Sequence, residues 1–293
     1  AAAPSISSLD PQPHLTPPRP RRPPSASLRT ADSLARAVRA LRALTGTRRR
    51  SFISDTAATP RVTLVPFSDL ARAAYCPRQL YYVRRDDERS VPPTARERID
   101  LAFRYDELVD APDRTLRRLP LHRSPASYRR NLDRLRERDL YGRLVDPATE
   151  RGFLSGKDCH GTVHKVLEPR ESDESPGDDE EAGPPPVPTL VSSGEPPENG
   201  VWEPQAARAV GIAKALAWER EREVERALVE YPAVGVVREV RLTTRKKAAY
   251  REALRAARSI DGPPPRVDDD RCAPCDYRGE CGTRRRSVRS LLG

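Results

Sequence analysis

The sequence predicts an α/β fold in which helices flank a few short strands and both ends of the chain meet at a metal site. Several long stretches keep apolar residues at helical spacing, while shorter stretches alternate apolar and polar residues. Three cysteines, Cys272, Cys275 and Cys281, fall within ten residues near the end of the chain, and a fourth, Cys76, lies far upstream. A site built from these four thiols would join the first and last parts of the fold.

The expected elements follow from this periodicity, taken in chain order. Ser68 is a suitable N-cap for the first helix, which carries Cys76, and Pro204 fits the first turn of the longest helix. A later stretch alternates Val240 and Leu242 with Glu239 and Arg241, as a half-buried strand does. We expect helices over residues 69–83, 94–109, 126–138, 203–228 and 244–259, and strands over 62–66, 152–154, 161–167, 189–192 and 234–243.

Composition divides the chain into a core of residues 61–283 and two tails. Residues 1–60 are rich in Pro, Ser, Arg and Ala with few large apolar side chains, which predicts a disordered basic tail. Residues 284–293 form a second basic tail. Inside the core, residues 171–188 are acidic and rich in Pro and Gly, which predicts a flexible surface loop.

Charge and hydropathy limit the partners that can be inferred from composition. The 293 residues carry 53 basic and 43 acidic side chains, a net charge of +10. Ten Arg against three acidic residues lie in residues 1–60, so the core is only mildly basic and does not by itself indicate nucleic acid. No apolar run approaches the length needed to cross a membrane. We therefore expect a soluble cytoplasmic protein with no membrane partner.

The cysteine spacing favours a metal over disulfides. The count of five is odd and no segment resembles a signal peptide, while C-x2-C thiols inside cells more often bind metal or do redox work. Zinc and an iron–sulfur cluster both remain open, although zinc usually takes two C-x2-C pairs, whereas here Cys76 stands alone. Cys159 lies outside this frame and is expected to be a buried thiol.

Two motifs resemble those of a known family. Tyr75–Tyr82, with the sequence YCPRQLYY, and Cys272–Cys281, with the spacing C-x2-C-x-Y-x3-C, resemble the CRISPR-associated RecB-like exonucleases. These form the iron–sulfur branch of the PD-(D/E)XK nuclease superfamily, and the resemblance covers about residues 64–283. It implies a restriction-endonuclease-like core, closed by a 4Fe–4S cluster on Cys76, Cys272, Cys275 and Cys281. It also implies a DNA exonuclease that acts on single-stranded or exposed ends in spacer acquisition, with CRISPR adaptation proteins as partners.

The catalytic pattern of that family implies a second metal site, for Mn²⁺ or Mg²⁺. The pattern is an Asp after a G-x-x-D-like turn, E-x-K on the next strand and Q-x3-Y on a helix. Asp158 matches the Asp, and Gln205 matches the Gln. In one register Glu168 and Arg170 occupy the E-x-K positions, with Lys165 as an alternative cation. The resemblance thus implies Asp158 and Glu168 as metal ligands and Lys165 and Gln205 as further catalytic residues.

A second register removes both acidic and basic catalytic residues. It aligns 190–196, LVSSGEP, with the E-x-K-x-G-x-P of the family, so that Leu190 and Ser192 replace Glu and Lys. The resemblance favours a working Mn²⁺- or Mg²⁺-dependent deoxyribonuclease. The missing E-x-K favours a catalytically degenerate iron–sulfur module that binds DNA or a partner protein. A zinc-held adaptor unrelated to nucleic acid is the third possibility, and the identity of the metal would separate it from the other two.

Overall fold

The structure is a computed structural model that describes residues 63–169, 184–267 and 270–282. The predicted tails 1–60 and 284–293, and most of the predicted loop 171–188, lie outside these residues. The helices are α2 (Phe67–Tyr75), α3 (Pro77–Val83), α4 (Pro93–Asp100), α5 (Tyr105–Val109), α6 (Asp113–Leu116), α7 (Pro125–Arg136), α8 (Tyr141–Val145), α9 (Glu203–Glu219), α10 (Thr244–Arg258) and α11 (Arg278–Cys281). The strands are β1 (Val65–Pro66), β2 (Thr149–Glu150), β3 (Phe153–Ser155), β4 (Cys159–Thr162), β5 (Lys165–Leu167), β6 (Val187–Val191), β7 (Arg226–Tyr231) and β8 (Val236–Arg241).

The central sheet has five strands in the order β2-β5-β6-β7-β8. Strands β2, β5 and β6 pair antiparallel, with Lys165 opposite Thr189. Helix α9 then connects β6 to β7, and these two strands run parallel to each other. Strand β8 pairs antiparallel with β7. A smaller sheet, β1-β4-β3, pairs β1 parallel to β4 and β3 antiparallel to it. This mixture of helices and mixed sheets confirms the predicted α/β class.

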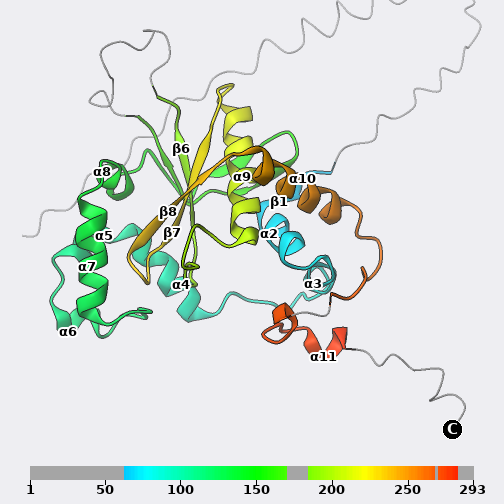
Figure 1. Cartoon of the computed structure of the whole chain (residues 1–293), viewed down its shortest axis with the longest axis horizontal. Coiled ribbons are helices and arrows are strands. Elements are labelled where there is room, and N and C mark those ends of the chain that lie inside the picture. The colour runs from blue at the N-terminus through cyan, green and yellow to red at the C-terminus, as the bar shows by residue number, and fades with distance from the viewer. Residues whose placement is uncertain (1–62, 170–183, 268–269, 283–293) are drawn as a thin grey trace, which may run out of the picture. The chain divides into compact units, whose positions relative to one another are not determined.

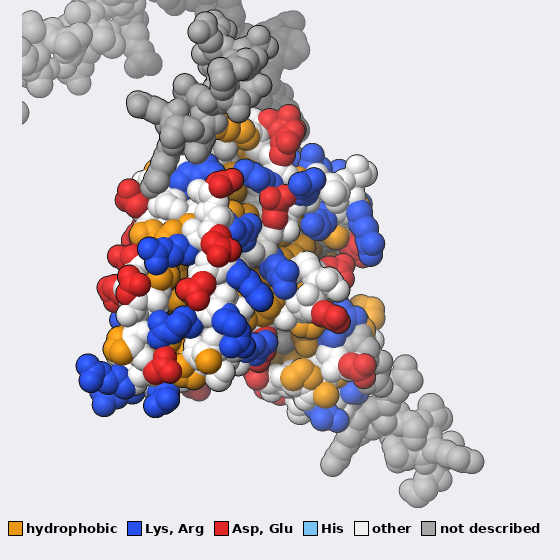
Figure 2. Space-filling view, turned by 60° about the vertical axis from the view of Figure 1, so that its left-hand side comes forward, with side chains coloured by type: hydrophobic (Ala, Val, Ile, Leu, Met, Phe, Trp, Pro, Cys, Tyr) orange, Lys and Arg blue, Asp and Glu red, His pale blue; other side chains and the backbone are white. Residues whose placement is uncertain are grey.

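Helices cover both faces of the central sheet, so that its inner strands β5, β6 and β7 are buried on both sides. Alternate residues of β6, β7 and β8 contribute to two separate apolar clusters. Leu190, Val229 and Val240 join α2, α9 and α10, whereas Val191, Leu228 and Val237 join α5, α7 and α8. Figure 1 shows α9 on one side of the sheet and α5, α7 and α8 on the other, and the side that carries α7 comes forward in Figure 2.

The longest predicted helix ends earlier than its sequence pattern suggests. Helix α9 stops at Glu219 instead of residue 228, and the segment from Arg226 onward is strand β7. Glu221 has a φ of 50°, a left-handed conformation that helices cannot continue through. Every residue from Ala227 to Tyr231 is buried, and a short run of buried residues does not show by periodicity whether it is helix or strand.

The predicted strand over 161–167 is two strands in different sheets. β4 ends at Thr162 in the small sheet and β5 begins at Lys165 in the central sheet. Gly161 has a φ of 141°, which favours glycine, and its backbone packs against Phe67. The strand expected over 152–154 is β3, which pairs with β4 so that Phe153 lies opposite Thr162.

Two further helix predictions need correction in detail. The helix predicted over 69–83 is α2 and α3, separated at Cys76, and Pro66, not Ser68, precedes α2. The helix predicted over 94–109 is α4, a 3-10 turn over Leu101–Phe103, and α5. The predictions over 126–138 and 244–259 hold as α7 and α10, whose N-caps are Ser124 and Thr243. No described helix has both the length and the apolar content needed to cross a membrane.

Candidate metal centre

Cys76 lies at the break between α2 and α3, and the following proline explains the break. A residue before Pro is disfavoured in the helical region, and Cys76 has φ −164° and ψ 111°. Its N–H still donates to the carbonyl of Arg72 at 2.8 Å, and its carbonyl accepts from Leu80 N at 3.2 Å. The thiol is therefore held at a corner between two helices.

The three other cysteines lie on a short C-terminal segment with little core of its own. Cys272 ends a 3-10 turn, Cys275 follows in a tight turn and Cys281 ends α11. The thiol of Cys272 donates to the carbonyl of Val267 at 2.8 Å. Of residues 270–282, Tyr277 is the one that is buried.

Two pairs of tyrosine contacts dock this segment onto α2 and α3. Tyr75 Oη donates to the carbonyl of Arg271 at 2.7 Å, and the Arg271 guanidinium donates to the carbonyl of Tyr75 at 2.8 Å. The ring of Tyr277 stacks on Tyr82 with centroids 5.7 Å apart. Tyr277 Oη also donates to Asp86 at 2.6 Å. Desolvation, together with this carboxylate, raises the pKa of Tyr277 to about 12.

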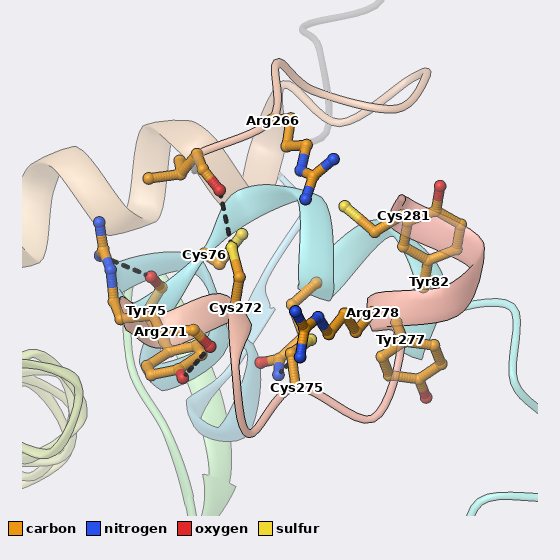
Figure 3. Close-up of a pocket in the computed structure, with 12 residues that line it drawn as sticks. Tyr75, Cys76, Tyr82, Arg266, Arg271, Cys272, Cys275, Tyr277, Arg278 and Cys281 are labelled. Atoms are coloured by element: carbon orange, nitrogen blue, oxygen red, sulfur yellow. Dashed lines mark hydrogen bonds between the residues drawn. The ribbon is translucent and has the colours of Figure 1, made fainter. Parts of the chain in front are cut away.

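The docking places all four cysteines on the wall of one cavity. All four are free thiols, and Figure 3 shows them around the cavity with Arg266, Arg271 and Arg278 among them. Within the described residues, no three His, Cys, Asp or Glu side chains form a group that could hold a metal ion as they stand. The structure thus brings the four predicted ligands to one cavity without setting them at ligation distance.

Hydrogen-bond donors from the first motif surround these thiols. Gln79 Nε2 donates to Cys275 Sγ at 3.6 Å. The Arg78 guanidinium donates to the carbonyl of Pro264 at 2.7 Å, while its Nε is buried with no partner among the described residues. Desolvation acts against its charge, but the Cys281 thiol and the Tyr82 hydroxyl outweigh this and raise the pKa of Arg78. Such donors stabilise thiolates, so the donor set fits an anionic, thiolate-bound centre.

The predicted catalytic residue Asp158 lies in the small sheet, away from the central one. It directly precedes β4, and Arg258 of α10 pairs with it at 3.1 Å. It borders a hollow that Lys157 and Lys214 also line, and no other carboxylate is among the residues that line this hollow. A divalent cation would meet one carboxylate there among three cationic side chains.

Lys165 is a buried structural residue of the central sheet. Its side chain has 0% exposure, and its Nζ donates to the carbonyls of Ala102 at 2.6 Å and Leu144 at 2.7 Å and to Glu230 at 3.2 Å. Thr189 Oγ1 donates to the other oxygen of Glu230 at 2.6 Å. Burial raises the pKa of Glu230, although Lys165 opposes the shift. The ammonium group is thus enclosed and faces the α5 and α8 side of the sheet.

Glu168 and Gln205 lie at opposite ends of β6. Leu167, next to Glu168, is opposite Val187 at the start of β6, whereas Gln205 Nε2 donates to Ser192 Oγ at 2.8 Å just past its end. Five residues of strand separate these points by roughly 15 Å. Glu168 pairs with Arg220 at 3.3 Å. The structure therefore does not bring Asp158, Glu168, Lys165 and Gln205 together.

A different set of polar residues meets Gln205 on the α9 side of the sheet. Val191 N donates to His164 Nδ1 at 3.2 Å, and the Tyr231 hydroxyl donates to Gln205 Oε1. Burial, followed by the charges of Arg208, Arg151 and Lys165, lowers the pKa of His164 to about 3. From the sequence alone, His164 at a strand end is expected to be an ordinary surface side chain, although its spacing from Gly161 is that of G-x-x-D with His in place of Asp.

Comparisons with known proteins add no relative to this description. The sequence matches no family model, and no curated protein matches it. What the chain does is therefore inferred from its own residues.

We predict that Lys165→Met destabilises the fold strongly, because it leaves the Glu230 carboxyl buried without its cation. Breaking one side of a buried pair costs about 3–5 kcal/mol. The double variant Lys165→Met/Glu230→Gln should recover most of the loss, since the amide still accepts from Thr189. Urea unfolding of the three proteins measures this. Equal stability of Lys165→Met and the parent would show that the buried pair does not support the fold.

We also predict that the neutral His164 makes folding sensitive to acid. In the unfolded chain a histidine takes up a proton near pH 6.5, whereas the folded protein resists protonation until about pH 3. This contribution to stability is therefore complete above pH 6.5 and is lost as the pH falls toward 3. His164→Asn keeps an acceptor for Val191 N but cannot titrate. Its unfolding free energy should fall less than that of the parent across this window, and parallel pH curves would contradict the prediction.

Proposed function

We propose that this chain is a nuclease-like module that is held together by a 4Fe–4S cluster and binds DNA without cleaving it. The observation that carries the proposal is the polar set at the end of β6. The positions that a PD-(D/E)XK enzyme fills with Glu and Lys hold Leu190 and Ser192, and Gln205 is bonded to that serine. A phosphodiesterase of this class needs carboxylates at this place.

The order of elements supports the comparison with that nuclease core. The catalytic pattern needs an Asp on one strand, E-x-K on the next strand and Gln on the helix that follows. Strand β5, strand β6 and helix α9 stand in this order, with β5 and β6 paired and α9 crossing to the parallel β7. On this assignment His164, Leu190, Ser192 and Gln205 occupy the four positions. The register with Leu190 and Ser192 is favoured over the one with Glu168.

The chemistry of these four side chains argues against a Mg²⁺ or Mn²⁺ site. Hard divalent ions require several oxygen ligands, usually carboxylates, and this set offers one hydroxyl and one amide oxygen that already accepts a hydrogen bond. Arg208 lies close enough to His164 to depress its pKa, and its own Nε is buried with no partner among the described residues. The positive charge of Arg208 beside His164 disfavours the binding of Mg²⁺ or Mn²⁺ at this place. A working nuclease centred on Asp158 is the rival reading, and it would have to act with one carboxylate paired to Arg258.

The cysteine centre supports a cluster through the surroundings of the thiols. Cys76, Cys272, Cys275 and Cys281 would hold it, and the donors of Arg78 and Gln79 would offset the negative charge of the thiolates. When bound, the group would cross-link the first and last segments of the fold, in the way that structural metals contribute folding free energy. Its part in the proposal is structural.

We predict that anaerobically prepared protein binds DNA but does not degrade it with Mg²⁺ or Mn²⁺. The expected result is a shift in fluorescence anisotropy of a labelled oligonucleotide with no change in its length on a denaturing gel. Asp158→Ala should behave like the parent in both measurements. Cleavage that disappears in Asp158→Ala would overturn the proposal in favour of the enzyme, and cleavage that persists there would point to a contaminant.

We predict that Cys76→Ala loses the cluster and stability together. The parent should contain about four irons and equimolar sulfide per chain. Cys76→Ala should lose most of both and unfold at a lower denaturant concentration. Cys159→Ala is the matched control, because its thiol is buried against Gly211 and Tyr250 on another part of the fold. It should keep its iron. Zinc without iron or sulfide in the parent would exclude the cluster.

A further inference from the structure

A broad groove lies between α7 and the turn that joins β7 to β8. Its volume is about 620 Å³, and the segment Pro196–Glu198 forms its third side. Four arginines line it, and we call it the arginine groove: Arg123, Arg134, Arg138 and Arg238. It lies on the α7 side of the sheet, the side that comes forward in Figure 2, where basic side chains gather among fewer acidic ones.

Hydrogen bonds and close packing fix the two walls of the groove to each other. Asn131 of α7 donates to the carbonyl of Val234 at 2.8 Å, and Arg138 donates to that of Val237 at 2.9 Å. Gly235, with a φ of 76°, lets the turn approach α7 closely, since a Cβ there would meet Tyr128 at 3.2 Å. The groove is therefore a built feature of the fold.

Three of the four guanidinium groups have no carboxylate partner among the described residues. Arg138 donates to the carbonyl of Val237, and Arg238 donates to the backbone carbonyl of Glu198 at 3.5 Å. The side chain of Arg134 has no hydrogen bond or ion pair with any described residue. The Nε of Arg238 is buried without a partner in the described part of the chain. Glu198 is the single carboxylate in the lining, and no described cation pairs with it. The groove thus concentrates three guanidinium charges that no described carboxylate pairs with.

We propose that the arginine groove binds the phosphodiester backbone of single-stranded DNA, which rests on the DNA-binding function proposed above. A guanidinium presents its donors as a planar fork that matches the oxygens of a phosphate. Arg138 and Arg238 are already anchored by one carbonyl each, so binding a phosphate costs them less side-chain entropy. The groove lining contains no aromatic side chain on which bases could stack. Contacts to phosphates alone make the binding independent of sequence.

The salt dependence of DNA affinity tests this proposal. The probe is a short single-stranded oligonucleotide of mixed sequence, titrated with the full chain over a range of salt concentrations. Each phosphate contact contributes about 0.7 to the slope of log K against log salt for single strands. Arg134→Gln/Arg138→Gln/Arg238→Gln should therefore lower the slope by about 2 and weaken binding at every sequence. Arg134→Gln alone breaks no side-chain bond, so it should keep the fold and lower the slope by about 0.7.

A matched set of arginines on the opposite side provides the control. Arg245, Arg251 and Arg255 are exposed residues of α10, which packs on α2 and α9. Their triple Gln variant removes the same charge and should keep the parent slope. If the parent binds DNA and the groove variant has the same slope, the assignment of DNA binding to the groove is wrong, while the proposed function stands. An equal loss in both triple variants would also overturn the groove, because charge anywhere would then suffice. A parent that binds no DNA would overturn both.

An acidic peptide is the other polyanion that such a groove could hold. Polyglutamate in excess over the oligonucleotide distinguishes the two. On the present proposal it competes weakly, because its carboxylates are spaced along a different backbone. Full displacement of the DNA by this excess of polyglutamate would overturn the assignment to a phosphodiester chain.

Discussion

The docking of the C-terminal segment at the corner between α2 and α3 is the contact on which the cavity of the four thiols depends. Residues 270–282 bury Tyr277 and little else, so their own packing supplies little free energy. Ordering each residue costs about 1–2 kcal/mol of backbone entropy, whereas a hydrogen bond returns about 1 kcal/mol. The two hydrogen bonds between Tyr75 and Arg271 and the stacking of Tyr277 on Tyr82 are too few to offset this entropy cost. A cluster on the four thiols would supply the difference, and the segment has no comparable apolar alternative.

A second buried contact fixes the helical layer that carries α7. Lys165 reaches from β5 to the carbonyls of Ala102 and Leu144, which belong to the helical side, while Glu230 of β7 balances its charge. An ammonium group in this place accepts few alternative arrangements, because each of its donors needs a partner. The pair therefore ties the 3-10 turn over Leu101–Phe103 and helix α8 to the central sheet, on the side of the sheet that also carries α7.

The sequence could predict the class of the fold and the meeting of the cysteines, but not which polar side chains meet at the end of β6. The cysteine frame is readable because thiols are rare and their spacing is short. Helices α7 and α10 were predictable from apolar residues at helical spacing. The break at His164 and the start of β7 were not, because buried runs such as Ala227–Tyr231 carry no period of their own. The resemblance implies Lys165 as a catalytic cation, and the sequence gives no sign that its side chain is buried on the α5 and α8 side of the sheet.

The polar groups at the end of β6 differ from those beside the thiols and in the arginine groove in how far the protein itself satisfies them. The polar groups beside β6 form hydrogen bonds within the protein itself; they belong to His164, Ser192 and Gln205. An active site instead keeps ligands available for its ion and substrate. In the described residues, buried donors without partners include the Nε atoms of Arg78 beside the thiols and Arg238 in the groove, along with the hydroxyls of Tyr105 and Tyr128. Because a guanidinium has donors and no acceptors, these places suit anions: the thiolates and sulfides of a cluster in one case and phosphates in the other.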